Sequence, residues 1–188
     1  FSYLDTMLTG LGRSDLIILA ARPGMGKTSF ALNIATNVAK KQKVPVAIFS
    51  LEMTKDQLSG RILSAEGGIS SQAFRTGQPT GQEWDDLAPA ANIMFETPIY
   101  MDDTSSITIP EMKAKILRIN QDPSRPNVGV VIIDYLQLMS SGRRSDNRVQ
   151  EISEITRNLK IMAKELNVPV IALSQLSRAA EKSSGRSD

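Results

Sequence analysis

Cysteine and histidine are both absent from this sequence of 188 residues. The chain therefore has no thiol nucleophile, no serine–histidine triad, no disulfide and no zinc site of the usual ligand sets. Any general base must be a carboxylate, unless a lysine, a tyrosine or an amino-terminal amine takes that role. The acidic residues are thus the first candidates for catalysis.

Long apolar runs and a strong charge bias are also missing. No apolar stretch approaches the length that spans a bilayer, and the start shows no cleavable-signal pattern, so we expect a cytoplasmic protein without membrane contact. A formal net charge of +2 gives no general attraction to nucleic acid, so such binding must depend on local clusters. The hydrophobic content of 41% can fill one core, and the length predicts one domain. Because the chain starts at Phe1 and ends in the polar run 183–188, we expect a fragment of a longer protein.

The stretch Ala-Arg-Pro-Gly-Met-Gly-Lys-Thr at 21–28 is the strongest motif. It lies between the apolar run 16–20, which is typical of a buried strand, and the segment 29–38, which has the apolar spacing of a helix. In that context glycines turn backbone N–H groups toward phosphate oxygens, and the helix adds the positive end of its dipole. The sequence therefore predicts a phosphate-binding loop. The alternative is a strand-to-helix turn that happens to be rich in glycine.

The positions of this loop have expected parts in binding a nucleoside triphosphate. Lys27 would reach the β- and γ-phosphates, and the hydroxyl of Thr28 would ligate Mg²⁺. The opening glycine of the motif is replaced by Ala21. The residues expected to bind the nucleotide are Arg22, Pro23, Gly24, Met25, Gly26, Lys27, Thr28 and Ser29.

Strand-like and helix-like segments alternate along the chain. After the first strand and helix, we expect strands at 46–51, 98–101, 128–133 and 168–173, and helices at 54–66, 83–88, 109–119 and 148–166. Thr54 is the expected N-cap of the second helix. This alternation predicts an α/β fold with a mostly parallel sheet and helices on both faces.

Polar residues follow the predicted strands, at the edge where an open α/β sheet binds its ligand. They are Glu52, the pair Asp102-Asp103, Asp134 and Gln175. Asp134 has the form of the aspartate that holds Mg²⁺ through water, although an aspartate here could simply cap the next segment. Glu52 is the best candidate base for the attacking water, although the helix dipole also favours a glutamate in a first turn. Gln175 suits a γ-phosphate sensor, and equally an ordinary surface amide.

Four segments carry a resemblance to a known family. They are Ala-Ala-Arg-Pro-Gly-Met-Gly-Lys-Thr (20–28), Phe-Ser-Leu-Glu-Met (49–53), Ile-Asp-Tyr-Leu-Gln-Leu-Met (133–139) and Ala-Leu-Ser-Gln-Leu-Ser-Arg (172–178). In order and spacing they resemble the helicase motifs of the bacterial replicative DNA helicase family DnaB. The resemblance covers essentially the whole chain, and Ala21 in place of the first glycine agrees with the family form.

The resemblance implies a RecA-like P-loop motor domain filling residues 1–188. Such a domain hydrolyses ATP with Mg²⁺ in a homo-hexameric ring that moves along single-stranded DNA and unwinds duplex. By resemblance, Glu52 is the catalytic glutamate, Asp134 the magnesium-holding residue and Gln175 the γ-phosphate sensor. A primase and a helicase loader are implied as partners, and the bacterial cytosol or a plastid as the location. The family's N-terminal bracing domain, its arginine finger and most of its second DNA-contacting loop would lie outside this chain.

The segment 140–147 is basic and rich in small residues. It contains Arg143 and Arg144, and Arg148 follows it. The segment leaves the predicted sheet near the nucleotide edge, and in RecA-like motors a loop placed there faces the central channel. We therefore expect these arginines to contact DNA phosphates without base readout, the alternative being a solvated loop.

Two other classes of protein share the phosphate-binding loop. A RecA- or RadA-type recombination ATPase has the same fold but fits the segments 49–53 and 133–139 less well. A non-motor RecA-like ATPase is the third class. Unwinding of a forked duplex with a free 5′ tail would separate the helicase from both.

Overall fold

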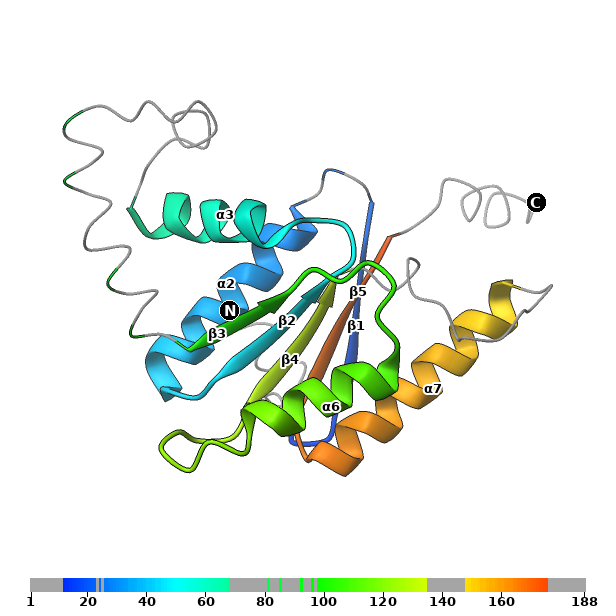
Figure 1. The fold of residues 1–188 in the computed structure, drawn as a ribbon. Helices are drawn as coiled ribbons and strands as arrows, with labels where there is room; N and C mark the ends of the chain where they lie inside the picture. The colour runs from blue at the N-terminus through cyan, green and yellow to red at the C-terminus, as the bar shows by residue number, and fades with distance from the viewer. Residues whose placement is uncertain are drawn as a thin grey trace.

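The computed structural model describes residues 12–22, 24, 26–67, 98–134 and 148–175, together with residues 81, 85, 92 and 96. Figure 1 shows the fold. The described elements are β1 (Leu16–Ala21), α2 (Lys27–Gln42), β2 (Val46–Ser50), α3 (Lys55–Gly67), β3 (Ile99–Asp102), α6 (Ile109–Ile119), β4 (Val130–Asp134), α7 (Arg148–Leu166) and β5 (Val170–Gln175). None of the helices in these ranges is long and apolar enough to cross a membrane.

The strands form one sheet in the order β1-β5-β4-β2-β3. Each neighbouring pair is parallel. Parallel neighbours need a crossover between them, which explains why the apolar runs alternate with helices along the chain. Because the strands run the same way, their carboxyl ends meet at a single edge. The register places Ala21 beside Gln175 and Ser50 beside Asp134 at that edge.

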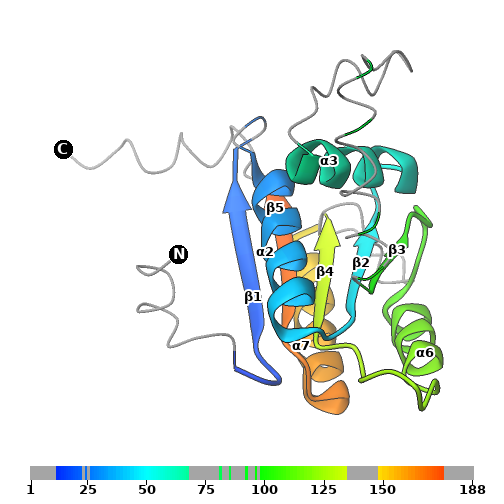
Figure 2. The same ribbon diagram turned by 90° about the vertical axis from the view of Figure 1, so that its left-hand side faces the viewer.

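Helices cover both faces of the sheet (Figure 2). On one face, α2 and α3 pack on strand residues such as Ile48 and Ile132. On the other face, α6 and α7 pack on Phe49 and Ile133, the next residues along the same strands. Successive side chains of a strand point to opposite faces, so two continuously apolar strands supply both halves of the core. The predicted α/β fold with helices on both faces is confirmed.

Local signals set the starts of two helices. Before α6, the side chain of Thr108 accepts a hydrogen bond from the backbone of Glu111, and the Glu111 carboxylate accepts one from the backbone of Thr108. Before α3, Thr54 and Gln57 exchange the same pair of bonds, at 3.0 and 3.3 Å. Each pair satisfies two N–H groups that a helix start leaves without partners. The predicted N-cap at Thr54 is confirmed.

Two strands start later than their apolar runs predict. The runs begin at Val128 and Val168, whereas β4 and β5 begin at Val130 and Val170. The backbone N–H of Val128 bonds to the Asn120 side chain, and that of Val168 bonds to the carbonyl of Ala163. Both groups are therefore unavailable to the sheet. The same strands end later than predicted, so Asp134 and Gln175 are their last residues. Of the helix expected at 83–88, only Asp85 is described.

Candidate nucleotide-binding site

The connection from β1 to α2 has the backbone geometry of an anion-binding loop. Gly24 and Gly26 have φ values of +79° and +74°, and a Cβ atom at either position would meet nothing within 4 Å. Glycine is thus required by the left-handed backbone and not by lack of space. Helix α2 begins with no side-chain cap and no acidic residue in its first turn. No capping side chain or acidic residue of the first turn therefore offsets the positive end of its dipole, which favours an anion.

The first turn of α2 contacts the end of β4. Thr28 Oγ1 donates a hydrogen bond to Asp134 Oδ2 at 3.0 Å. Lys27 Nζ lies 3.9 Å from Asp134 Oδ1, and the two side chains are 11% and 2% exposed. The fold thus brings Lys27 and Thr28 against Asp134, although 106 positions separate Thr28 from Asp134 in the sequence.

The carboxylate of Asp134 fits a site for Mg²⁺. Its Oδ1 atom is buried and accepts no hydrogen bond. Burying a carboxylate oxygen without a hydrogen bond is costly, the Lys27 ammonium at 3.9 Å offsets part of that cost, and a bound metal cation would offset more of it. No group of three ligating side chains gathers in the described part of the chain. Mg²⁺ commonly binds through one or two protein oxygens together with substrate phosphates, so Thr28 and Asp134 are a suitable donor set.

The turn after β2 places Glu52 beside this contact. Leu51 N–H donates to the Asp134 carbonyl at 2.6 Å, and Met53 N–H donates to the buried Ser50 Oγ at 3.0 Å. Both bonds fix the backbone on either side of Glu52, whose own side chain is exposed. Glu52 is therefore held at the edge of the sheet while its carboxylate faces solvent.

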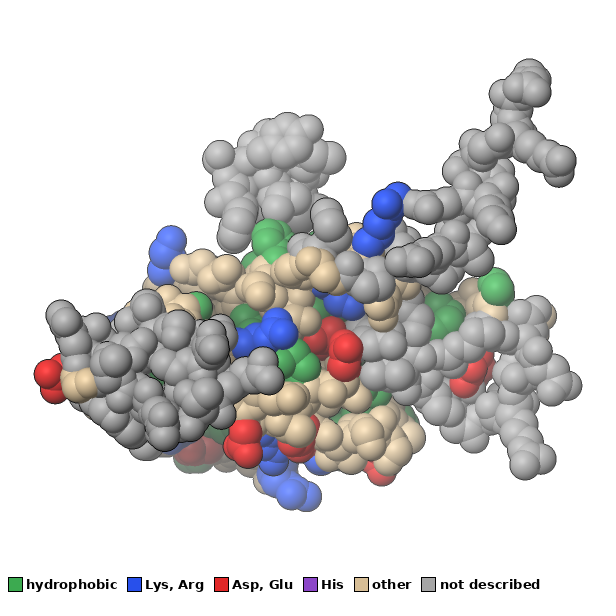
Figure 3. All heavy atoms as spheres, turned by 90° about the horizontal axis from the view of Figure 1, so that it is seen from above, with side chains coloured by type: hydrophobic (Ala, Val, Ile, Leu, Met, Phe, Trp, Pro, Cys, Tyr) green, Lys and Arg blue, Asp and Glu red, His purple; other side chains and the backbone are tan. Residues whose placement is uncertain are grey.

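A cleft of about 430 Å³ joins these residues. It is lined by Arg22, Gly24, Gly26, Lys27, Thr28, Glu52, Met53, Gln57, Arg61 and Gln175. Figure 3 looks onto this edge of the sheet, where acidic and basic side chains lie close together. Most of the predicted site residues in the described ranges thus share one cavity. Asp134 does not line the cleft, but it contacts Lys27 and Thr28, which do. Ser29 is exposed on α2 and does not line the cleft.

Three residues that line the cleft were not predicted from the sequence. Met53 follows Glu52 directly, and Gln57 and Arg61 lie on α3. The sequence signal for Gln57 and Arg61 is their spacing of one helical turn beside the apolar pair 58 and 62, which indicates a shared polar face of the helix but not what that face meets.

Asp102 and Asp103, the other acids at a strand end, do not line the cleft. Asp102 pairs with Lys115, and Asp103 lies against Lys55. Burial raises the pKa of Asp102, but hydrogen bonds from Lys115 and Thr104 outweigh it and hold the pKa below its ordinary value. A carboxylate with a lowered pKa is a weaker base. Glu52 therefore remains the acidic residue best placed to act on water.

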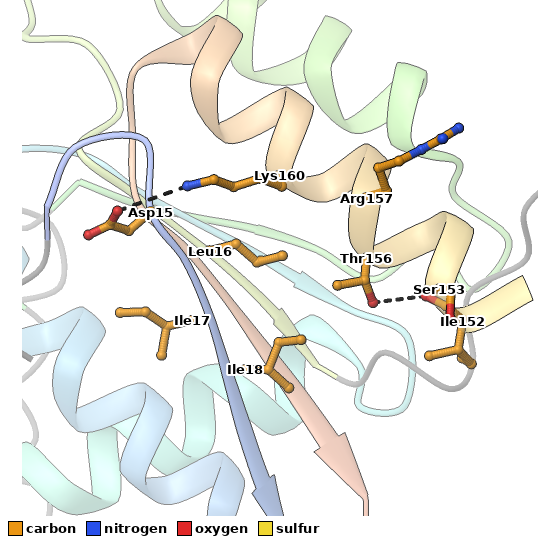
Figure 4. A pocket seen from close by; sticks show the side chains of 9 residues that line it. All are labelled: Asp15, Leu16, Ile17, Ile18, Ile152, Ser153, Thr156, Arg157 and Lys160. Atoms are coloured by element: carbon orange, nitrogen blue, oxygen red, sulfur yellow. Dashed lines mark hydrogen bonds and ion pairs between the residues drawn. The ribbon is translucent and has the colours of Figure 1, made fainter. Parts of the chain in front are cut away.

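A larger cavity, of about 770 Å³, lies elsewhere, between β1 and α7. Figure 4 shows Lys160 of α7 pointing toward Asp15, with a separation of 4.0 Å, while Arg157 points away from both. The wall of this cavity that β1 forms is apolar, and Ile18 in that wall is 44% exposed. The cavity contains neither the glycine loop nor the start of α2. Its size alone does not make it a phosphate site.

Five predicted residues cannot be placed fully. Pro23, Met25, Arg143 and Arg144 lie outside the described residues, and only the backbone of Arg148 is described, as the first residue of α7. Their predicted roles stay predictions.

Comparison with known families agrees with this geometry. A family model described as the DnaB-like helicase C terminal domain matches residues 1–187. The chain belongs to this family. The resemblance expected from the four sequence segments is confirmed.

Curated relatives are similar over nearly the whole chain. Replicative DNA helicase DnaB of Synechocystis sp. is 54% identical over 181 residues, covering 96% of this chain and 20% of that protein. Replicative DNA helicase DnaB of Geobacillus stearothermophilus is 54% identical over 183 residues, covering 97% of this chain and 40% of that protein. The chain therefore spans less than half the length of these relatives.

Solved structures support the same family and fold. A DnaB-like replicative helicase, studied with its primase interactions, has a TM-score of 0.87 at 36% identity, over all of this chain and 44% of its own. A second solved structure, described as an ATPase domain, has the same score and identity, over 97% of this chain and 64% of its own. The RadB recombinase has a TM-score of 0.51 at 18% identity, over 92% of this chain and 66% of its own, and shows the fold alone. These similarities confirm the RecA-like fold and favour the helicase over the recombinase among the predicted classes.

Proposed function

We propose that this chain is the ATP-hydrolysing motor domain of a replicative DNA helicase. The observation that carries the proposal is the contact between Thr28 and Asp134 at 3.0 Å. It joins the phosphate-binding loop to the end of a central strand, in a chain that belongs to the DnaB-like helicase family. We also propose that residues 1–188 act as one ATPase domain.

Several residues of the cleft have a proposed part in hydrolysis. The N–H groups at the start of α2 and the ammonium of Lys27 bind the β- and γ-phosphates, with Arg22 at the rim. Glu52 accepts a proton from the attacking water, since no histidine exists in the chain and Asp102 is engaged elsewhere. Gln175 ends the strand beside β1 and lines the cleft, and its amide would bond to the terminal phosphate.

Magnesium would be held by Thr28 and Asp134. When bound, Mg²⁺ neutralises charge on the phosphates and orients them. The unsatisfied Oδ1 atom of Asp134 supports this assignment from the protein's side. The Thr28 hydroxyl would then turn from the carboxylate to the metal.

We further propose that the motor works on single-stranded DNA within a homo-hexamer. Arg143, Arg144 and Arg148 would contact phosphates evenly along any sequence. A primase is the first partner to test, because a structural neighbour is described with its primase interactions. A helicase loader follows only from the family resemblance.

A forked DNA duplex with a free 5′ tail tests the function. The intact protein should unwind it with ATP and Mg²⁺, and the double variant Arg143→Ala/Arg144→Ala should bind single-stranded DNA more weakly on every sequence. ATP-driven strand exchange without unwinding would instead identify a recombinase. Hydrolysis that neither unwinds the fork nor responds to DNA would identify a non-motor ATPase.

A further inference from the structure

Helix α3 presents two polar side chains to the nucleotide cleft. Gln57 and Arg61 both line it, and their spacing of four residues places them on one face of the helix. Leu58 and Ile62, the next residue in each case, are 0% and 2% exposed and pack on α2 and the sheet. Because Leu58 and Ile62 are buried, the rotation of α3 about its own axis is fixed. The cleft-facing position of Arg61 is therefore set by the core.

The start of α3 is held in place from two sides. Thr54 and Gln57 exchange hydrogen bonds, so Gln57 Oε1 is already engaged. Asp103 Oδ2, on the residue directly after β3, accepts a hydrogen bond from Lys55 N–H at 3.0 Å. In Figures 1 and 2 the helix lies beyond the carboxyl ends of β2 and β4. Helix α3 therefore forms a wall of the cleft that these hydrogen bonds hold in place, on the side of Glu52 and Met53.

The charge of the cleft suits a polyanion, and Arg61 is one of its cations. The described lining residues include the cations Arg22, Lys27 and Arg61, and Glu52 is the one acid among them. Arg61 is exposed, and its side chain makes no ion pair or hydrogen bond with the described residues. The acids Glu66 and Asp103, at either end of the helix, pair with Lys40 and Lys55. The guanidinium is thus available to a ligand.

We propose that Arg61 binds the terminal phosphate of a bound nucleoside triphosphate, from the wall opposite the phosphate-binding loop. The inference rests on the proposed function, since it uses the same cleft. The loop and Lys27 hold the β- and γ-phosphates from one wall, while Arg61 shares the other wall with Glu52 and would add a second contact to the γ-phosphate. A guanidinium can form two parallel hydrogen bonds to phosphate oxygens, so it suits this role better than an ammonium. Arg61 would then distinguish a triphosphate from a diphosphate.

Equilibrium binding by the intact protein tests this assignment. The probes are a non-hydrolysable ATP analogue and ADP, each titrated in the presence of Mg²⁺. Arg61→Ala should weaken binding of the triphosphate analogue roughly 10- to 100-fold, the range for losing a hydrogen bond between charged groups, and should change ADP binding less than about twofold. Arg61→Lys should lie between, because it keeps the charge and loses the paired bonds.

The matched control is Arg118→Ala, on α6. That residue is also an exposed helical arginine, but α6 covers the other face of the sheet, so binding of both nucleotides should be unchanged. Equal weakening of both nucleotides by Arg61→Ala, or no weakening of either, would overturn the proposal. Lys27→Ala separates the two levels of inference. If Lys27→Ala binds both nucleotides normally, the cleft itself is wrongly assigned. If Lys27→Ala loses binding but Arg61→Ala affects both nucleotides equally or neither of them, only the role of Arg61 is rejected.

Discussion

Asp134 serves the fold and the candidate site at once. Its backbone carbonyl accepts a hydrogen bond from Leu51, which ties β4 to the turn after β2. Its carboxylate accepts one from Thr28 and lies near Lys27. A change at Asp134 would therefore alter burial, charge and the proposed metal binding together. Glu52 is the better position for separating binding from chemistry, because its side chain is exposed and its backbone is fixed by its neighbours.

Glu52→Gln should retain nucleotide binding and lose hydrolysis. The amide keeps the size and hydrogen bonding of the carboxylate but cannot accept the proton of the attacking water. Turnover should fall roughly 10²- to 10⁴-fold, while the affinity for ATP with Mg²⁺ stays close to that of the unchanged protein. Steady-state hydrolysis and equilibrium titration measure the two effects. Glu154→Gln, on α7, is the control and should leave turnover unchanged. Unchanged turnover in Glu52→Gln would mean that another residue is the base.

Much of the cleft could be predicted from the sequence because its residues stand at recognisable places. Lys27 and Thr28 follow the glycines of a motif, and Glu52 and Gln175 come at the ends of apolar runs. Gln57 and Arg61 could not be found by that reasoning, because they lie inside a helix and not at the end of a strand. Only the packing of α3 shows which of its faces meets the cleft.

Among the elements, apolar runs located the strands, and hydrogen bonds decided their limits. The predicted helices at 109–119 and 148–166 agree with α6 and α7 in both bounds. The helix after the loop is longer than its predicted 29–38, since α2 extends to Gln42. Its last turn contains Lys40 and Lys41, and positive side chains are favoured beside the carbonyl end of a helix.

The capping box of α6 gives a stability prediction. Thr108→Ala removes the side chain that accepts the Glu111 N–H bond, so the free energy of unfolding should fall by about 1 kcal/mol at neutral pH. Urea denaturation measures this. Ser106→Ala is the control, because its exposed side chain makes no hydrogen bond within the described residues. Equal stability of the Thr108 variant and the control would mean that the box does not stabilise the helix.

The same prediction has a pH dependence. Hydrogen bonds from the backbone and side chain of Thr108 hold the pKa of Glu111 below its ordinary value of 4.5. A carboxylate with a lowered pKa contributes its stabilisation fully above the ordinary value and loses it as the pH falls through the folded-state pKa. The difference between Thr108→Ala and the unchanged protein should therefore shrink below pH 4.5. Because alanine at this position keeps the backbone N–H that bonds to Glu111, a difference that stays constant into acid would show that the Glu111 carboxylate does not depend on the Thr108 side chain.

In the molecule as a whole, the parallel sheet is what assembles the site. Four segments far apart in sequence reach one edge because β1, β2, β4 and β5 all end there. Neither the motif nor the apolar runs alone could give the strand order, which depends on how the helices cross over the sheet. The order puts β5 between β1 and β4, so Gln175 lies beside the loop that follows Ala21.

Binding of a nucleoside triphosphate at this edge of the sheet underlies every other proposal, and equilibrium titration of Lys27→Ala with ATP and Mg²⁺ tests it. Lys41→Ala is the matched control, since Lys41 is exposed in the last turn of the same helix, far from the loop. We expect Lys27→Ala to lose detectable binding while Lys41→Ala binds like the unchanged protein. Unchanged binding by Lys27→Ala would contradict the phosphate-binding assignment and, with it, the proposed motor function.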